Sequence, residues 1–251
     1  MNEVTKIDGI GSSVRRTEDK KFLTGKGRYT DDINRPGQVQ AYFLRSDVAH
    51  AEIKSIDIKA AQSAPGVVGV FTGADIAADK VGGPICGWVV PCRDGSSTKE
   101  PPHPLLAQGK VRFVGDAVAV VVAETMEQAK SAAELIDVDY NELTPVVDFV
   151  NADKGAQIHE EVPNNCYFDW ELGDESATNK AIESAAKVVK LSVRNNRLVP
   201  NAMEPRSALA EFDSLDDSYT LHTTSQNPHL TRLVLAAFMF AIPESLSLIH
   251  I

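Results

Sequence analysis

Few side chains in this sequence have the types and the spacing that metal or nucleophilic chemistry requires. The three cysteines, Cys86, Cys92 and Cys166, show neither a zinc spacing nor an iron–sulfur spacing. The histidines also lack ligand spacing to cysteine or carboxylate, and they are His50, His103, His159, His222, His229 and His250. The residues alone therefore predict unpaired thiols and no metal site made of protein side chains.

The segment Gly25-Lys26-Gly27 could be taken for a phosphate-binding loop. Such a loop needs a strand before it and a helix N-terminus after it, so that free backbone N–H groups face the phosphate. Residues 28–32 (RYTDD) do not begin a helix, so we exclude a nucleotide-binding loop here.

Three polar residues in the last fifth of the chain are candidates for chemistry. Glu204 and Arg206 are separated by a proline, a pattern more typical of a surface turn or a structural ion pair than of a catalytic pair, and we assign them no chemistry. Gln226 precedes a helix that the pattern predicts from Pro228. The residues alone favour a glutamine that caps this helix.

Composition and charge limit the class of protein and its partners. The chain has 251 residues, 43% of them hydrophobic, which is enough to form one large domain or two smaller ones. The formal charge of −10 would on average repel a nucleic acid backbone or an anionic membrane. No window is long and apolar enough for a membrane span, and no signal peptide is recognisable. We expect a cytoplasmic protein that binds neither nucleic acid nor membrane.

Alternating and continuous apolar patterns predict the elements of the first part of the chain. Strands are expected at 39–45, 51–58, 67–71, 117–122 and 136–140. One short helix is expected at 59–64, and another begins with a capping box of Thr125 and Gln128 and reaches Leu135. Strand, helix and strand follow one another twice, which indicates an α/β domain. The Gly- and Pro-rich stretch 82–104 predicts a long surface loop.

The remainder of the chain is predicted to form a second, separate unit. An aperiodic stretch at 151–165 indicates a linker, and a helix is expected at 179–186. Strands are expected at 188–198, 208–212 and 219–224, followed by the helix from Pro228, whose apolar residues recur at the helical period.

Three collinear segments resemble the large subunit of the molybdenum hydroxylases, the family of xanthine dehydrogenases, aldehyde oxidases and aerobic carbon monoxide dehydrogenases. Residues 11–33 are similar to the opening of bacterial members, and residues 45–67 with 114–119 are similar to the family's α/β hammerhead domain. Met203-Glu204-Pro205-Arg206 with residues 224–229 resembles the start of the molybdenum-cofactor domain. The resemblance therefore implies an α/β (α+β) fold, a hammerhead domain followed by the truncated start of a molybdopterin-binding domain.

The resemblance also implies the domain limits. Residues 1–19 would be an N-terminal extension and 20–150 the hammerhead domain. Residues 151–165 would be the linker, and 166–251 the incomplete start of the molybdenum-cofactor-binding domain.

The activity implied is that of a molybdenum-dependent oxidoreductase, which hydroxylates an aldehyde or an N-heterocycle or oxidises carbon monoxide. The cofactor implied is molybdopterin, in bacteria usually the cytosine dinucleotide form. Partner subunits would be a small subunit with iron–sulfur clusters and a medium subunit with FAD, and the substrate a small molecule. The cofactor would carry the difficult chemistry and the protein would position it.

One residue role carries over from the family. Gln226 matches a glutamine that lies beside the molybdenum and hydrogen-bonds an oxo ligand, so it is the expected cofactor-binding residue. The family's glycine-rich loop and its general-base glutamate have no counterpart here, and residues 245–251 fit the family poorly. We therefore expect no catalytic residue and no activity within the fragment itself. A stand-alone hammerhead protein acting as an interaction or assembly module is the alternative.

Overall fold

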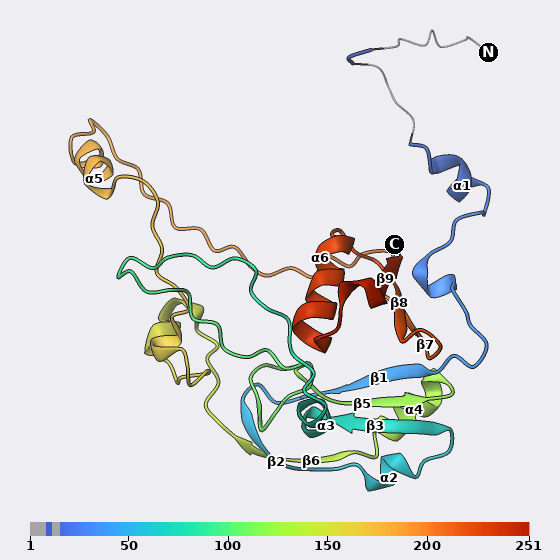
Figure 1. The fold of residues 1–251 in the computed structure, drawn as a ribbon. Coiled ribbons are helices and arrows are strands. Elements are labelled where there is room, and N and C mark those ends of the chain that lie inside the picture. Colours follow the sequence, from blue (N-terminus) through green and yellow to red (C-terminus); the bar gives the residue numbers. More distant parts are fainter. Residues whose placement is uncertain (1–8, 12–15, 251) are drawn as a thin grey trace.

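The structure, a computed structural model, describes residues 9–11 and 16–250. Much of the predicted N-terminal extension, residues 1–8 and 12–15, lies outside this range, as does Ile251. The chain forms two three-stranded sheets in its first part and a third near its end, as Figure 1 shows. Within the described residues, no helix has the length and apolar character to cross a membrane.

The first sheet is built around a central, largely buried strand. Its order is β1 (Gln40–Arg45), β5 (Ala117–Ala123) and β3 (Val67–Thr72), with both strand pairs antiparallel. Val121 faces Tyr42 on one side and Val70 on the other, and it is completely buried. The continuous apolar run from 117 to 122 predicted a central strand, and this prediction is confirmed.

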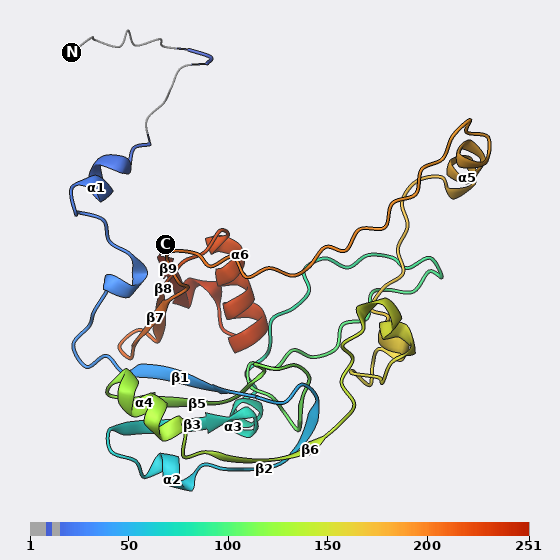
Figure 2. The ribbon, with the colours of Figure 1, turned by 180° about the vertical axis from the view of Figure 1, so that it is seen from behind.

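Helix α4 (Met126–Ala133) covers this sheet, as Figure 2 shows. Its buried face consists of alanines, Ala129, Ala132 and Ala133, which let the helix approach the strands closely. The predicted capping box is present: Thr125 N donates to Gln128 Oε1 at 3.0 Å, and Gln128 N donates to Thr125 Oγ1 at 3.2 Å. The helix therefore starts at the residue that the sequence indicated.

The second sheet has the order β4 (Lys110–Val111), β2 (Ala51–Asp57) and β6 (Asp137–Glu142), again all antiparallel. The helix α2 (Lys59–Gln62) connects β2 to β3, and α4 connects β5 to β6. Each strand–helix–strand unit therefore passes from one sheet to the other instead of adding a parallel neighbour. Ile56 and Val138 of the second sheet contact the buried clusters of both sheets, so one core holds the two sheets together.

A helix that the sequence did not predict follows β3. It is α3 (Gly73–Ala78), capped by Thr72, whose N and Oγ1 donate to Asp75 Oδ2 at 2.7 and 2.8 Å. The backbone N–H of Thr72 and then its hydroxyl lower the pKa of Asp75. Gly73 lies against the Ala107 carbonyl without room for a side chain. The short helix is thus fixed by its cap and by this close approach.

The third sheet lies in the last part of the chain. The strands β7 (Ala208–Asp213) and β8 (Ser218–Thr223) form an antiparallel hairpin, and β9 (Ser247–His250) pairs with β8 in parallel. A helix α6 (Pro228–Leu233) follows β8 and continues as the π-helix η4 (Val234–Phe240). The hairpin and the helix from Pro228 match the prediction.

The predicted strand at 188–198 is wrong. Residues 185–207 contain no helix or strand, and the segment crosses open space between α5 (Glu175–Glu183) and β7 in Figure 1. Its apolar side chains are exposed, for example Val189 at 81% and Leu191 at 86%. The alternating pattern is typical of a strand, but a strand also needs a neighbour for its backbone hydrogen bonds, and no described strand pairs with this segment. The expected helix at 179–186 is α5, which begins four residues earlier and ends three residues earlier.

Short single-turn helices account for the remaining regular structure. They are α1 (Asp19–Leu23), η1 (Thr30–Asp32), η2 (Phe149–Lys154), η3 (Pro163–Asn165) and η5 (Glu244–Leu246). Within the segment predicted as a linker, the Asn165 amide group donates to the carbonyl oxygens of Ala152 and Ala156 at 2.8 and 2.9 Å. Val162 is buried there at 1% exposure, so this segment is folded against its surroundings.

A polar contact joins the start of the chain to the third sheet. Arg35 Nε donates to Glu211 Oε2 at 2.8 Å, and His222 Nε2 lies 3.0 Å from Glu211 Oε1. The hydrogen bond from Arg35, reinforced by His222, lowers the pKa of Glu211. The carboxylate therefore accepts from both neighbours in its ionised form.

The capping box of α4 gives the first testable prediction. Thr125→Ala removes the hydroxyl that accepts from Gln128 N, so we expect the free energy of unfolding to fall by about 0.5–2 kcal/mol in urea titrations. Asp174→Ala removes the equivalent cap of α5, which buries no residue, and should leave the main transition unchanged. If both variants lost the same free energy of unfolding, the effect of the Thr125 cap could not come from the core that α4 covers.

The contact of Glu211 gives a prediction about pH. Its folded-state pKa is lowered, so its contribution to stability is present above the unfolded-state pKa of about 4.3 and disappears as the pH falls through the lower, folded-state value. Glu211→Gln should therefore lower the midpoint of thermal unfolding at pH 7, and the difference should shrink below about pH 4. Thr125→Ala should instead show a difference that persists across this range. A constant deficit for Glu211→Gln would refute the electrostatic contact.

Candidate functional site

The turn between β8 and α6 carries the residue that the sequence singled out. Gln226 lies between the end of β8 at Thr223 and the start of α6 at Pro228, and its side chain is exposed. It makes no hydrogen bond to any other side chain or backbone group in the described part of the chain. The carboxamide therefore retains its donors and its acceptor for a ligand.

The residues around Gln226 make the bonds that fix this turn. Asn227 N donates to Ser225 Oγ at 3.2 Å, and Ser225 Oγ lies 3.0 Å from Thr231 Oγ1. Thr231 N and Oγ1 both donate to the Asn227 carbonyl at 2.9 Å. Asn227 is the N-cap and Pro228 occupies the first turn, where its missing N–H is not needed. The interpretation of Gln226 as a helix cap is thus wrong, because the N-cap residue is Asn227 and Gln226 makes no hydrogen bond to the first turn of the helix.

Glu204 and Arg206 are not brought to this turn as a pair. Both side chains are exposed, and no ion pair joins them among the residues that the structure describes. Both lie in the extended segment that precedes β7.

The helix behind the turn is held at both of its ends. At its far end Ala241 adopts a left-handed conformation with φ of 53°, and Ile242 N donates to the Ala236 carbonyl at 2.9 Å. Arg232 Nε lies 3.4 Å from Glu244 Oε2, close enough for an ion pair but without the geometry of a hydrogen bond. Helix α6 and η4 thus form one unit with the turns that flank it.

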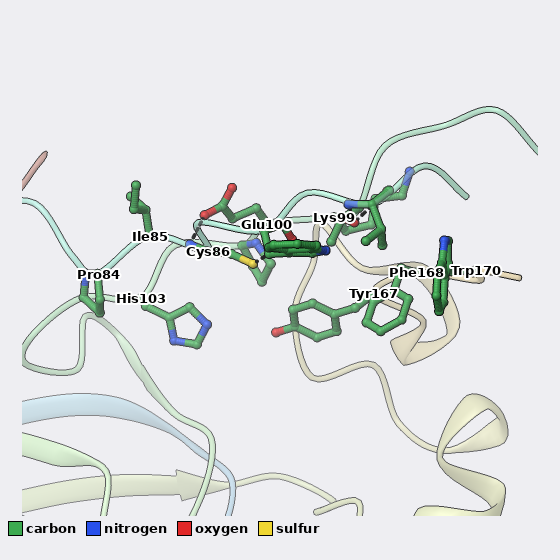
Figure 3. Close-up of a pocket in the computed structure, with 13 residues that line it drawn as sticks. Pro84, Ile85, Cys86, Lys99, Glu100, His103, Tyr167, Phe168 and Trp170 are labelled. Atoms are coloured by element: carbon green, nitrogen blue, oxygen red, sulfur yellow. Dashed lines mark hydrogen bonds between the residues drawn. The ribbon is translucent and has the colours of Figure 1, made fainter. Parts of the chain in front are cut away.

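A second candidate site is an aromatic pocket, drawn in Figure 3. It has a volume of about 710 Å³ and is lined by three segments of the chain. The lining residues are Pro84, Ile85, Cys86, Trp88, Val90, Thr98, Lys99, Glu100, Pro101, His103, Tyr167, Phe168 and Trp170. Both tryptophans of the sequence belong to it, and Trp88 is 80% exposed. The sequence predicted only a surface loop at 82–104 and not this pocket. The two tryptophans, which lie 82 residues apart, were the only sign of it in the sequence.

Backbone hydrogen bonds bring the two parts of this pocket together. Lys99 N donates to the Tyr167 carbonyl and Arg93 N donates to the Asp169 carbonyl, both at 2.8 Å. The Arg93 guanidinium also pairs with the Asp169 carboxylate at 2.8 Å, which raises the pKa of Arg93. The segment around Phe168 is thereby fixed along the loop that carries Trp88.

The inner end of the pocket is close to neutral. His103 and Tyr167 line it, and His159 lies beside both, with ring centroids 6.2 and 6.0 Å away. Burial, then the nearby Arg112 and His103, lower the pKa of His159, and burial raises the pKa of Tyr167. Both groups are therefore uncharged at neutral pH. The aromatic and apolar lining suits an apolar or planar group.

Neither site contains a set of metal ligands from the protein. Within the described residues no group of three or more histidine, cysteine or acidic side chains converges on one point. The three cysteines are free thiols. Among the residues that the structure describes, the two candidate sites are the unpaired Gln226 carboxamide in its fixed turn and the aromatic pocket.

Comparison with known proteins places these features in a family. The model of the aldehyde oxidase and xanthine dehydrogenase a/b hammerhead domain matches residues 24–144. The model of the molybdopterin cofactor-binding domain matches residues 158–247, which include the extended segment, the third sheet and the Gln226 turn. The sequence resemblance extended only to residue 244, because residues 245–251 fitted the family poorly. The family model continues to residue 247 and so reaches slightly further.

Similar proteins are known both as sequences and as structures. The carbon monoxide dehydrogenase large chain of Afipia carboxidovorans is 34% identical over 257 residues, 95% of this chain and 30% of the relative. The nicotine 6-hydroxylase large subunit of Paenarthrobacter nicotinovorans is 34% identical over 233 residues, 92% of this chain and 28% of the relative.

Among solved structures, the quinoline 2-oxidoreductase of Pseudomonas putida 86 superposes with a TM-score of 0.81 at 36% identity, covering 95% of this chain and 30% of that one. The chain thus spans about 30% of the length of these relatives. The hammerhead match over the first two sheets is followed directly by the cofactor-domain match over the third. The chain therefore belongs to the molybdenum hydroxylase family, that of the xanthine dehydrogenase, aldehyde oxidase and carbon monoxide dehydrogenase large subunits.

Proposed function

We propose that this chain supplies the hammerhead domain and one cofactor contact of the large subunit of a molybdenum-dependent oxidoreductase. The complete enzyme would hydroxylate an aldehyde or an N-heterocycle, or oxidise carbon monoxide. The observation that carries the proposal is the exposed, unbonded Gln226 carboxamide within the residues matched by the molybdopterin cofactor-binding domain. Relatives named for nicotine and for carbon monoxide are equally similar, so this region supports no choice of substrate.

The residues present fit one contact to the cofactor. The Gln226 side chain has two N–H donors, and Ser225, Asn227 and Thr231 fix the turn without using them. Gln226 would donate one hydrogen bond to an oxygen atom on the metal and so orient that group without being a ligand itself. When bound, molybdopterin, in the cytosine dinucleotide form that bacterial members favour, supplies the two-electron redox chemistry.

The proposal includes partner subunits. Relatives are named a large chain, a large subunit and a subunit gamma of a dehydrogenase complex, which supports an assembly of several different chains. We infer a small subunit with iron–sulfur clusters and a medium subunit with FAD, which would carry electrons away from the molybdenum. The charge of −10 disfavours a nucleic acid among the partners.

Gln226→Ala tests the cofactor contact in a large subunit of the relatives' length that contains this chain. We expect the rate per bound molybdenum to fall about 10–100-fold, because a hydrogen bond to a metal-bound group is lost. The midpoint of unfolding should not change, since the side chain has no partner in the described protein. Rate, molybdenum content and midpoint are measured on the same preparation.

Thr125→Ala is the control for Gln226→Ala, because it removes the cap of α4 and touches no residue of the Gln226 turn. It should lower stability by about 0.5–2 kcal/mol and leave the rate per molybdenum unchanged. If Gln226→Ala behaved like Thr125→Ala, with a lower midpoint and an unaltered rate per molybdenum, Gln226 would be a structural residue and the proposal would fail.

The 251-residue chain by itself should bind no molybdopterin and hydroxylate nothing. One neutral hydrogen bond contributes about 0.5–1.5 kcal/mol, roughly a tenfold change in affinity, which is far too little to hold a cofactor at micromolar concentration. Metal analysis of the purified chain after expression in cells that make molybdopterin should find molybdenum far below one atom per chain. A near-stoichiometric content would show that the chain holds the cofactor unaided.

A further inference from the structure

The loop after α3 touches the helix that follows the Gln226 turn. Gly82 N donates to the Met239 carbonyl at 2.8 Å, a direct backbone contact between the hammerhead part of the chain and the end of η4. Met239 is 8% exposed and Ala236 is completely buried, so this side of the helix is a packed surface. In both views of the ribbon α6 lies above the first sheet, next to its edge strand β1.

There is no space for a side chain at this contact. A Cβ atom on Gly82 would overlap the Phe238 carbonyl oxygen, and one on Gly83 would overlap the His103 carbonyl oxygen. In both cases the obstacle is backbone, which cannot move aside as the end of a flexible side chain can. The glycine pair is thus held between the end of the helix on one side and the 103–104 segment on the other.

Conformation does not explain these two glycines. Neither belongs to the residues with positive φ, so another amino acid could adopt their backbone angles. Gly115 illustrates the opposite case, with φ of 94° and nothing near a built Cβ atom. Glycine at 82 and 83 therefore serves the close approach of backbones and not the shape of a turn.

The helix transmits a shift of its end to its beginning. The π-helical part and the α-helical part are continuous from Pro228 to Phe240, and the ion pair of Arg232 with Glu244 ties the following turn back to the helix. Displacing Phe238 must therefore move or tilt the whole unit, including the turn at Gln226. In an enzyme, a misplacement of about 1 Å can cost about 10²-fold in rate.

We propose that Gly82 and Gly83 are positioning residues that set how deeply helix α6–η4 seats on the hammerhead domain, and so where the Gln226 turn lies. The part of this statement that concerns the cofactor rests on the proposed function of Gln226. The seating of the helix does not, because it follows from the Gly82–Met239 hydrogen bond and the two close backbone approaches.

Hydrogen exchange in the intact 251-residue chain tests the seating without any cofactor. Gly82→Ala should raise the exchange rate of amides in 228–240 about tenfold or more, because the helix end is pushed away from its seat. Amides of β5, in the centre of the first sheet, should exchange as in the parent chain. Gly83→Ala should also raise exchange in 228–240 and not in β5, because its Cβ atom would press against the His103 carbonyl and push the glycine pair towards the helix.

Gly87→Ala is the control, since a Cβ atom there meets nothing within 4 Å and the backbone needs no positive φ. It should leave exchange unchanged throughout. Two results overturn the proposal: unchanged exchange at 228–240 in Gly82→Ala, or an equal rise in β5, which would make Gly82 a residue of general stability. A failure of the Gln226→Ala experiment leaves this result untouched, so the two proposals can fail separately.

Discussion

Burial of β5 on both of its faces is the constraint on which the rest of the structure depends. Val118, Ala119, Val121 and Ala123 have no exposed surface, so the strand must be covered on both faces and paired on both edges. The strands β1 and β3 satisfy its backbone, and the alanine face of α4 covers it. The position of α4 then directs β6 into the second sheet, and the end of β3 leads through α3 to the loop at Gly82 that reaches the helix behind Gln226.

The elements that sequence patterns predicted well are those whose signals are local. The capping box of Thr125 and Gln128 and the apolar run of β5 each fix an element within a few residues. Sheet membership was not predictable in this way, because β2 and β3, joined by one short helix, pair with different partners. Helix α3 was missed because its cap, Thr72 with Asp75, is also the end of a strand, where the strand signal dominated.

In the candidate sites, too, a residue could be singled out from the sequence, but the contacts that build each site could not be predicted. Gln226 was found through resemblance, and its local geometry was not foreseen, because the hydrogen bonds of Ser225 with Asn227 and Thr231 depend on the exact turn that precedes Pro228. The aromatic pocket requires the segments that carry Trp88 and Trp170 to be joined by backbone hydrogen bonds, although they lie far apart in the sequence. Such tertiary contacts leave no periodic trace in a sequence.

The extended segment 185–207 has a consequence for how the chain behaves in concentrated solution. Val189, Leu191 and Val193 alternate with Lys190, Ser192 and Arg194, so the backbone has the pattern of a strand and lacks a neighbour. An open strand edge with an apolar face is a template for pairing between molecules, the first step towards aggregation. Lys190 and Arg194 interrupt that template with positive charge, and identical copies meeting there repel one another. Because salt screens this repulsion, the tendency of the segment to pair between molecules should rise with ionic strength.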